Sequence, residues 1–531
     1  MGSVPNCTIF ILLWKQAYHM AGSKMATLAK DTAIYGISSI VGRFLNYLLV
    51  PLHTRFINPA SGGYGIVTEM YAWAALLFVL LTFGMETTFF RFANKQEENE
   101  QMVYSTALRL VGGVSLLFII LAFIFITPIS VQLGYAEHPE YVGCFILIAG
   151  LDAFQAILFS RLRQQHRPIK FMTLKMAFII PNVLLNVFVF WLMPKMFSFM
   201  PGLETIYIKY NYGVGLIFFV NLLCTFCVTF GFIKELKGIT FGFDKQLARR
   251  MLAYAWPILL LGLVGILNQV FDKIAFTHIV QDRIWGKAQL GIYGACCKIA
   301  MLLALLTQAF RYAYEPFVFG NSKDKNSSET LAQGMKYFII FGILAFLAVM
   351  FYMPILQHLV SEPEPDPEFV KAGIIVHYRD GLKVVPIVMM AELFMGIYFN
   401  LSFWYKLIDK TWWGAVMSGI GAAVMITINV VFVPRYGYMA CAWGGFAGYG
   451  TCMLLSYFIG QKKSPIDYPL MDIFKYVMLA ALLYVIYLGC KPLNDWISMA
   501  INTVLIFIYL AYLFKKDLPL RSLPVIGKYF R

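Results

Sequence analysis

Long apolar runs recur through this sequence, and they limit its fold more than any other feature. One of them, Leu76–Leu81, lies within the stretch 64–90, where polar residues are few. A helix needs about 20 apolar residues to cross a bilayer. Because lipid cannot satisfy backbone polar groups, only helices and closed barrels span membranes. Barrel strands alternate apolar and polar residues over about ten positions. These runs do not alternate, so the sequence predicts an all-α integral membrane protein.

The composition agrees with a chain that faces lipid. Of its 531 residues, 60% are hydrophobic and only 13% are charged, whereas soluble domains carry about 25% charged residues. The length rule predicts about 14 transmembrane helices. Their approximate ranges are 30–56, 64–90, 103–127, 141–160, 170–193, 210–233, 252–278, 290–314, 335–359, 384–404, 412–433, 438–460, 471–489 and 494–514.

The formal net charge is +15, which in a soluble protein would suggest nucleic-acid binding. The distribution of the charge indicates membrane topology instead, because Lys and Arg accumulate in cytoplasmic loops. Most of the 43 Lys and Arg residues fall on one side when alternate loops are counted from a cytoplasmic N-terminus. Two of the loops on that side contain Arg161, Arg163, Arg167 and Lys170, and Lys234, Lys237, Lys245, Arg249 and Arg250. We therefore expect a multi-pass protein with both termini in the cytoplasm and no nucleic-acid partner.

No metal site and no cofactor are predicted. Cys224 and Cys227 have the spacing of a redox or metal pair, but they lie in an apolar run with no histidine nearby, and we interpret them as small core residues. The segment 1–27 is predicted to be an N-terminal extension outside the core. Its apolar stretch, Ile9–Trp14, is too short to span a membrane and lacks the features of a signal peptide.

Short sequence words recur in the same order in the two halves of the chain. Leu28–Lys30 is matched by Leu247–Arg249, and Phe90–Ala93 is matched by Phe310–Ala313 at almost the same separation. Transporters are often built from such duplicated halves. Because six helices return the chain to its starting side, the repeat predicts two parallel lobes related by an axis along the membrane normal.

The repeat also predicts the boundaries of the domains. The N-lobe is predicted to comprise 28–245, with helices 1 to 6, and the C-lobe 246–465, with helices 7 to 12. The remaining part, 466–531, is predicted to hold helices 13 and 14 and a cytoplasmic tail.

Several further words run in order along the chain. They are Leu28–Thr32 leading into Ser38, Ser39 and Arg43; Gly84–Thr87 through Phe90–Phe92; Arg161–Gln164 followed by Phe171; Asp272–Lys273; and Gly291–Tyr293 through Lys298–Ile299. Together with the helix count, they resemble bacterial polysaccharide-transport flippases of the multidrug/oligosaccharidyl-lipid/polysaccharide exporter superfamily, which move O-antigen (lipopolysaccharide) or capsule repeat units. The resemblance implies a V-shaped pair of lobes around a central cavity that opens alternately to each side.

The same resemblance implies a substrate and a location. The substrate is a polyprenyl-diphosphate-linked oligosaccharide, built on undecaprenyl diphosphate and moved from the cytoplasmic to the outer leaflet of the bacterial inner membrane. A peptidoglycan lipid-precursor flippase and a cation-coupled multidrug exporter are the alternatives, although the drug-exporting branch typically lacks the last two helices.

The expected partners are this lipid-linked substrate, membrane lipids and a polysaccharide polymerase or ligase, and the chain is expected to act as a monomer. We do not expect an enzyme, because the acidic residues are scattered singly over different predicted helices.

Buried cations are the candidate substrate-binding groups. A charge at the bilayer centre costs about 2.5–3.5 kcal/mol, so it normally faces a cavity or a partner. One face of the first predicted helix carries Arg43, Asn46, Val50 and His53. A guanidinium binds phosphate oxygens in a bidentate fork. We therefore predict that Arg43, with Asn46 beside it and Lys298 in the C-lobe, binds the diphosphate; the alternative for Arg43 is a buried ion pair with Glu69.

Asp272 and its neighbours are candidates for ion coupling or ion pairing. Asn268 lies one helical turn before Asp272, and carboxylate and amide oxygens suit a hard cation, so the two are candidate ligands for Na⁺ or H⁺ coupling. The favoured alternative pairs Asp272 with Lys298. Lys273 points about 100° away from Asp272 around the helix, so we do not expect these two side chains to face each other.

Four charged residues are candidates for a cytoplasmic gate. Glu86 and Arg91 lie near one end of the second predicted helix, and Arg311 and Glu315 lie at the matching place in the eighth. Charges at helix ends usually form a solvated rim, but the repeated placement also predicts a gate between the lobes.

Overall fold

The computed structural model is all-helical in the residues that it describes, which confirms the predicted fold class. The described residues are 36, 41–42, 44–45, 47–94, 98–210, 212–237, 239, 244–320, 327–364, 367–371, 375–408, 410–490 and 494–518. Arg43 and Asn46, the two predicted anchors in the first helix, lie outside them.

The helices follow the predicted order along the chain. Those of the N-lobe are α3 (Leu49–Phe56), η1 (Pro59–Ser61), α4 (Gly63–Thr82), α5 (Met85–Ala93), α6 (Glu100–Ile124), α7 (Ile126–Leu133), α8 (Pro139–Gln164), α9 (Pro168–Val187), η2 (Phe188–Leu192), η3 (Met193–Met196), α10 (Pro201–Lys209), α11 (Val214–Phe230) and α12 (Ile233–Leu236). Those of the C-lobe are α13 (Lys245–Ile279), α14 (Arg283–Gly320), α15 (Ser327–Phe351), α16 (Met353–Leu356), η4 (Gln357–Leu359), α17 (Pro367–Lys371), η5 (Tyr378–Val384), α18 (Val385–Leu401), α19 (Phe403–Leu407), α20 (Trp412–Tyr436) and α21 (Tyr438–Lys463). The last two are α22 (Leu470–Cys490) and α23 (Asp495–Lys516).

Within the described residues, 11 helical segments are long and apolar enough to cross a membrane, so the predicted count of 14 is not confirmed. The number of such segments rises to 12 if α10 and α11, which are bent by 95° to each other, are counted as one span. The first predicted span falls largely outside the described residues. The twelfth predicted span does form a helix, α21, but its glycines and polar aromatic residues lower its mean hydropathy.

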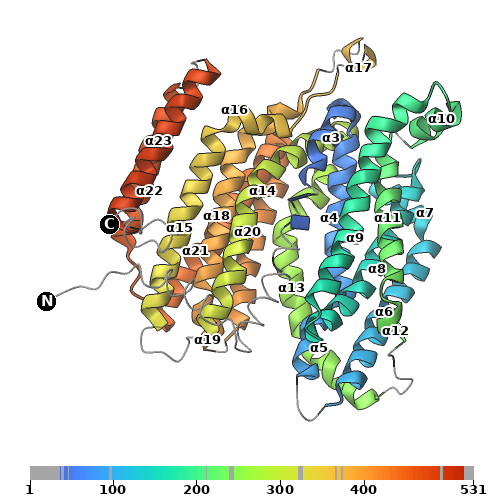
Figure 1. Ribbon diagram of the computed structural model, residues 1–531, viewed down its shortest axis with the longest axis horizontal. Helices are drawn as coiled ribbons and strands as arrows, with labels where there is room; N and C mark the ends of the chain where they lie inside the picture. The colour runs from blue at the N-terminus through green and yellow to red at the C-terminus, as the bar shows by residue number, and fades with distance from the viewer. Residues whose placement is uncertain are drawn as a thin grey trace.

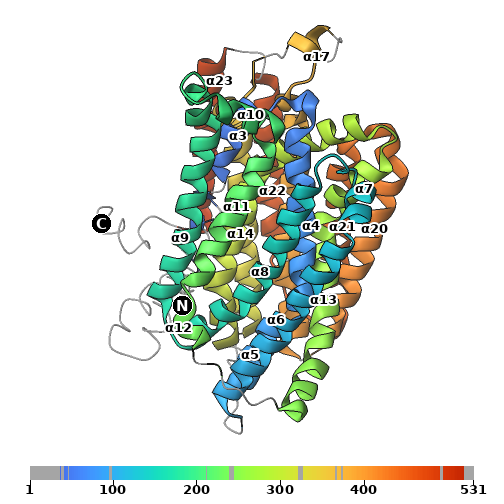
Figure 2. The same ribbon diagram turned by 90° about the vertical axis from the view of Figure 1, so that its right-hand side faces the viewer.

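Figure 1 shows the N-lobe helices, in blue to green, beside the C-lobe helices, in yellow to orange, with α13 between the two groups. We name the two ends of the bundle after helices that lie there. The α17 end also holds α10 and α16, and the α5 end also holds α12 (Figures 1 and 2). The helices α22 and α23 stand at the outer edge of the C-lobe.

Helices in a membrane approach each other through small residues, since lipid removes the hydrophobic force between them. The contact between α20 and α21 follows this rule. A Cβ on Gly421 of α20 would lie 2.7 Å from the carbonyl oxygen of Gly448 on α21. These two glycines therefore allow the helices to pack backbone against backbone.

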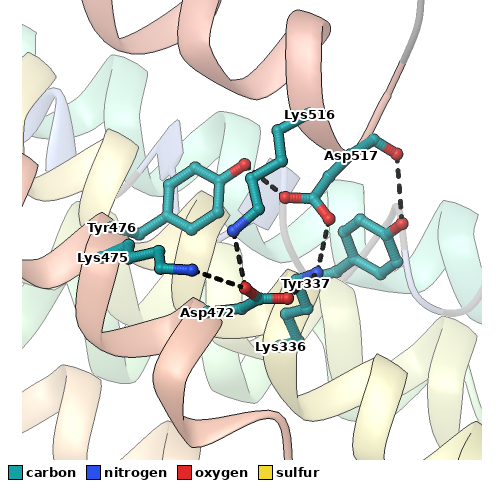
Figure 3. A network of polar contacts seen from close by, with 7 residues as sticks. All are labelled: Lys336, Tyr337, Asp472, Lys475, Tyr476, Lys516 and Asp517. Atoms are coloured by element: carbon teal, nitrogen blue, oxygen red, sulfur yellow. Dashed lines mark hydrogen bonds and ion pairs between the residues drawn. The ribbon is translucent and has the colours of Figure 1, made fainter.

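A buried ionic network attaches the last two helices to α15. The Lys336 ammonium donates to the carboxylates of Asp517 and Asp472, and Lys516 donates to Asp472 at 2.7 Å (Figure 3). The Tyr476 hydroxyl donates to Asp517. Only 7% of the Lys336 side chain is exposed, and a buried cation of this kind requires its anionic partners.

Candidate functional site

A cavity of about 740 Å³ lies between the two lobes, a volume typical of small-molecule sites. Its walls come from α3, α4, α9 and α11 on one side and from α13, α14, α18, α20 and α21 on the other. The polar side chains that line it are Tyr47, His53, Tyr64, Thr68, Tyr71, Asn182, Asn186, Asn221, Asn268, Gln269, Asp272, Lys273, Tyr293, Lys298, Thr307, Gln308, Arg311, Glu315, Glu392 and Tyr449. The central cavity implied by the resemblance is therefore present.

The charges of this cavity are divided unequally between its walls. Among the described lining residues, every Asp, Glu, Lys and Arg belongs to the C-lobe: Asp272, Lys273, Lys298, Arg311, Glu315 and Glu392. The described N-lobe lining presents amides, hydroxyls and one imidazole. One wall is therefore suited to charged groups of a ligand and the other to its neutral polar groups.

Toward the α17 end, the cavity is closed by direct contact between α4 and α14. A Cβ on Gly65 of α4 would lie 1.9 Å from the carbonyl oxygen of Lys287 in the second turn of α14, so only glycine permits this approach. The Tyr378 hydroxyl of the C-lobe also donates to the carbonyl oxygen of Ile57 in the N-lobe at 2.9 Å. We call this contact the closed end of the cavity.

Glu69 lies near the closed end, fully buried, and it does not line the cavity. Its carboxylate accepts hydrogen bonds from Thr277 Oγ1 of α13 at 2.9 Å and from the Tyr135 hydroxyl at 2.7 Å. Burial and the neighbouring Glu69 carboxylate raise the pKa of Tyr135 well above its usual value, so this hydroxyl remains a donor. The bond to Thr277 joins the two lobes, which places Glu69 in the lobe contact rather than among the cavity's charged groups.

At the opposite end, the cavity reaches the exposed side chain of Arg311. The Arg311 guanidinium carbon lies 4.1 Å from the centroid of the Phe399 ring. Glu315, one turn further along α14, accepts a hydrogen bond from Lys406 Nζ at 3.4 Å. Both partners belong to the C-lobe.

The other two gate candidates contact different residues. Glu86 accepts a hydrogen bond from the Arg163 guanidinium of α8 at 2.9 Å, and the Arg91 guanidinium carbon lies 4.1 Å from the ring centroid of Tyr254 on α13. Neither Glu86 nor Arg91 lines the cavity. In the described residues, therefore, the four gate candidates are not brought together, and each carboxylate pairs with a cation of its own lobe.

The prediction that Asp272 pairs with Lys298 was wrong, because Asp272 forms its ion pair with Lys273. The Lys273 ammonium lies 2.9 Å from both carboxylate oxygens of Asp272. It also donates to the carbonyl oxygen of Gln269, one turn earlier. The angle of 100° separates the directions of the Cβ atoms, but the long lysine side chain curls back along its own helix and closes the gap. The Tyr293 hydroxyl donates to Asp272 Oδ2 at 2.8 Å and completes the cluster.

Asn268 lines the cavity beside this cluster, and its amide nitrogen is engaged elsewhere. It donates to the carbonyl oxygens of Val264 at 3.1 Å and of Ser418 at 3.0 Å. The bond to Ser418 fixes α13 against α20. The structure thus brings Asn268, Asp272 and Lys273 to one wall, as a cluster in which the lysine already neutralises the carboxylate.

Lys298 projects from α14 into the cavity, and its ammonium lies 5.7 Å from the ring centroid of Tyr47 across the cavity. Within the described part of the chain, no carboxylate forms an ion pair with it. Val50 and His53 line the same cavity, which confirms that this face of the first predicted helix points inward. The predicted anchors Arg43 and Asn46 lie outside the described residues.

Several cavity residues are not among the predicted site residues. The N-lobe wall contains Asn182 and Asn221, and the C-lobe wall contains Glu392 and Tyr449. Polar amides inside apolar runs are a usable sequence signal, because such groups avoid lipid. Asn182 and Asn186, one turn apart, carry this signal on a single helix face.

In the described residues, no group of three or more His, Cys, Asp or Glu side chains could hold a metal ion. Cys224 is buried and Cys227 is exposed, so the two thiols of this pair point in different directions. The cavity can instead bind a ligand that combines an anionic group with neutral hydroxyl or amide groups.

Comparisons with known proteins agree with this architecture. A solved structure described as the lipid II flippase MurJ in an inward closed conformation is 16% identical, with a TM-score of 0.68, and the match covers 91% of this chain and 99% of that chain. An inward-facing multidrug resistance MATE family transporter of the MOP superfamily is 14% identical, with a TM-score of 0.60, over 82% of this chain and 96% of that chain. At these identities, the similarity establishes the fold alone, which this chain shares with both structures.

The sequence itself gives the family. No match was found among curated proteins. The sequence profile of the family described as "Polysaccharide biosynthesis protein" matches residues 28–311, which is more than half of the chain. The chain therefore belongs to the polysaccharide biosynthesis protein family.

Proposed function

We propose that this protein is a flippase that moves a polyprenyl-diphosphate-linked oligosaccharide from the cytoplasmic to the outer leaflet of the inner membrane by alternating access. The observation that carries the proposal is the central cavity. It is closed by helix contact at the α17 end, reaches the exposed Arg311 at the other end, and offers cations on one wall and amides on the other. A saccharide joined to a diphosphate has the same two kinds of polar group.

Lys298 is the proposed contact for the diphosphate. Lys273 is neutralised by Asp272, and Arg311 stacks on Phe399 near the surface. Lys298 faces the cavity beside the Tyr47 ring and forms no ion pair within the described residues. Because an intramembrane cation is costly, one held without a carboxylate is best explained by an anionic ligand. Arg43 remains the proposed second anchor, with Asn46 beside it.

The proposed orientation of the cavity in the membrane rests on the distribution of Lys and Arg among the loops. The basic segments around Arg163 and Lys234 lie toward the α5 end, and Lys and Arg mark cytoplasmic loops. The α5 end is therefore proposed to be cytoplasmic, so that the cavity receives the substrate from the inner leaflet. The family and a structural relative described as a lipid II flippase support a lipid-linked, saccharide-bearing cargo.

The experiment is flipping of undecaprenyl diphosphate carrying a short oligosaccharide in proteoliposomes. Lys298→Met and Arg43→Ala are each expected to reduce the rate at least tenfold while the protein remains monodisperse. Arg43→Lys should recover part of the rate, since an ammonium cannot form the guanidinium fork. Wild-type rates in both Lys298→Met and Arg43→Ala would contradict this diphosphate site.

The same assay separates the proposal from its alternatives. Selective flipping of peptidoglycan lipid precursors would indicate the precursor flippase. Export of cationic dyes driven by a Na⁺ or H⁺ gradient, without flipping of any lipid, would indicate a multidrug exporter. In cells, deletion of the gene should cause the lipid-linked intermediate to accumulate in the cytoplasmic leaflet.

A further inference from the structure

The N-lobe wall of the cavity contains a fixed amide donor, Asn182. His53 Nε2 lies 2.9 Å from Asn186 Oδ1, and the Asn186 amide nitrogen donates to both the backbone carbonyl oxygen and the Oδ1 atom of Asn182. Asn186 is thus fully engaged, and it holds the side-chain oxygen of Asn182. Asn182 is only 6% exposed, and its amide nitrogen has no partner among the described residues. Because Asn182 lines the cavity, a ligand there can accept a hydrogen bond from this donor.

Tyr71 is the second fixed group on this wall. The Asn221 amide nitrogen donates to the Tyr71 hydroxyl oxygen at 2.7 Å. This leaves the hydroxyl proton of Tyr71 as a donor without an acceptor in the described part of the chain. The Phe145 ring meets the Tyr71 ring edge to face, with centroids 5.4 Å apart, and fixes its plane. Because Tyr71 is 38% exposed, its ring and hydroxyl are accessible from the cavity.

The two groups share an environment that suits a sugar. Sugar hydroxyl and acetamido oxygens accept hydrogen bonds from neutral donors, and sugar rings pack their C–H faces on aromatic rings. The described residues of this wall carry no Asp, Glu, Lys or Arg, whereas Lys298 lines the cavity from the opposite wall. A ligand whose phosphate contacts Lys298 can therefore extend its sugar toward Asn182 and Tyr71.

We propose that Asn182 and Tyr71 form the saccharide subsite of the transport cavity and that His53, Asn186 and Asn221 act as positioning residues behind them. This inference rests on the proposed function and deepens it. Lys298 on the C-lobe wall, with Arg43 as the proposed second anchor, binds the diphosphate that all such substrates share. The N-lobe wall binds the sugar, which differs between substrates, and so it determines specificity.

The test compares two probes on the purified full-length protein in nanodiscs: undecaprenyl diphosphate, and undecaprenyl diphosphate bearing one N-acetylhexosamine. Asn182→Leu removes the amide donor, and Tyr71→Phe removes the hydroxyl but keeps the ring. Each is expected to weaken binding of the sugar-bearing probe about 3- to 10-fold, the effect of one neutral hydrogen bond. Binding of the sugar-free probe should change less than about twofold, because its diphosphate has no sugar group to accept from Asn182 or Tyr71.

Asn429→Leu is the matched control. Asn429 lies on α20, the repeat counterpart of the helix that carries Asn186, and it is equally buried but does not line the cavity. Both probes should bind this variant like the wild type. Equal weakening of both probes in Asn182→Leu and Tyr71→Phe, or no weakening of the sugar-bearing probe, would overturn the subsite while leaving the flippase proposal intact. Failure of the wild type to bind either probe would instead overturn the proposed function, and the subsite with it.

Discussion

Lys273 and Asp272, which are adjacent in sequence, form an ion pair with each other in the wall of the central cavity. The ammonium lies 2.9 Å from each carboxylate oxygen, and the exposed fractions of the two side chains are 18% and 8%. The pair makes this part of the C-lobe wall electrically neutral. On the neighbouring α14, Lys298 has no carboxylate partner in the described residues, and Arg311 near the surface stacks on Phe399.

The pair predicts a specific pattern in a double-mutant experiment. Asp272→Asn leaves Lys273 unpaired at low dielectric, and breaking such a pair costs about 3–5 kcal/mol. The double variant Asp272→Asn/Lys273→Met removes the unpaired charge and should recover part of the lost stability. The measurement is the unfolding temperature of the purified protein. Additive losses, with the double variant less stable than Asp272→Asn, would show that the two side chains are independent.

The same variants address ion coupling. If Asp272 bound a coupling Na⁺ or H⁺ together with Asn268, flipping by Asp272→Asn would lose its dependence on the ion gradient, and adding Lys273→Met would restore nothing. Because the lysine already neutralises the carboxylate, we expect partial restoration of flipping in the double variant. A cation can favour one conformation only by as much as its affinities for the two states differ.

The closed end predicts the effect of a single added methyl group. Gly65→Ala would place Cβ within 1.9 Å of the Lys287 carbonyl oxygen, so α4 and α14 must separate. We expect the equilibrium to shift away from this closed state. A cysteine in place of Val67, which is buried beside the contact, should then react with an impermeant thiol reagent added from the α17 end.

Gly113→Ala on α6 is the control for this change. A Cβ there has nothing within 4 Å, and alanine favours a helix over glycine by about 0.8–1.0 kcal/mol. This variant should keep the cysteine at position 67 protected. Protection that persists in Gly65→Ala, with unchanged stability, would show that the helix contact does not hold the cavity closed.

Hydropathy predicted the positions of the spanning helices well and their ends less well. The predicted spans 252–278 and 290–314 are observed as α13 and α14, which extend to Lys245–Ile279 and Arg283–Gly320. Hydropathy reports the part of a helix in lipid, whereas the hydrogen-bonded helix continues into polar surroundings. The bend between α10 and α11 was not predicted, because it depends on the left-handed backbone at Gly213, with a φ of +89°.

The sequence identified cavity-lining residues only where a simple rule for a single helix applies. Helical periodicity predicts that His53 points inward, and the cost of a buried charge predicts that Lys298 faces a cavity. The partners of Glu69 could not be predicted, because Tyr135 and Thr277 come from segments whose register depends on packing. The contact of Lys273 with Asp272 depends on the conformation of a flexible side chain, which periodicity does not describe.

The network around Lys336 predicts how the last two helices stay attached. Lys336→Met leaves the Asp517 and Asp472 carboxylates without their buried cation (Figure 3), and we expect a loss of about 3–5 kcal/mol in stability. Lys475→Met is the matched control, because Lys475 is 52% exposed and lies 3.7 Å from Asp472; it should cost less than about 1 kcal/mol. Equal losses of unfolding temperature in the two variants would contradict this assignment.

The proposed orientation predicts which ends of the protein are accessible from outside the cell. Lys462 is exposed at the last turn of α21, and Glu364 is exposed at the opposite, α17 end. In a background without the nine native cysteines, Glu364→Cys should react with an impermeant thiol reagent added to intact cells, and Lys462→Cys should react only after permeabilisation. The reason is the concentration of Lys and Arg in the loops on the Lys462 side, which retains those loops in the cytoplasm. The reverse pattern would place the closed end in the cytoplasm and would contradict entry of the substrate from the inner leaflet.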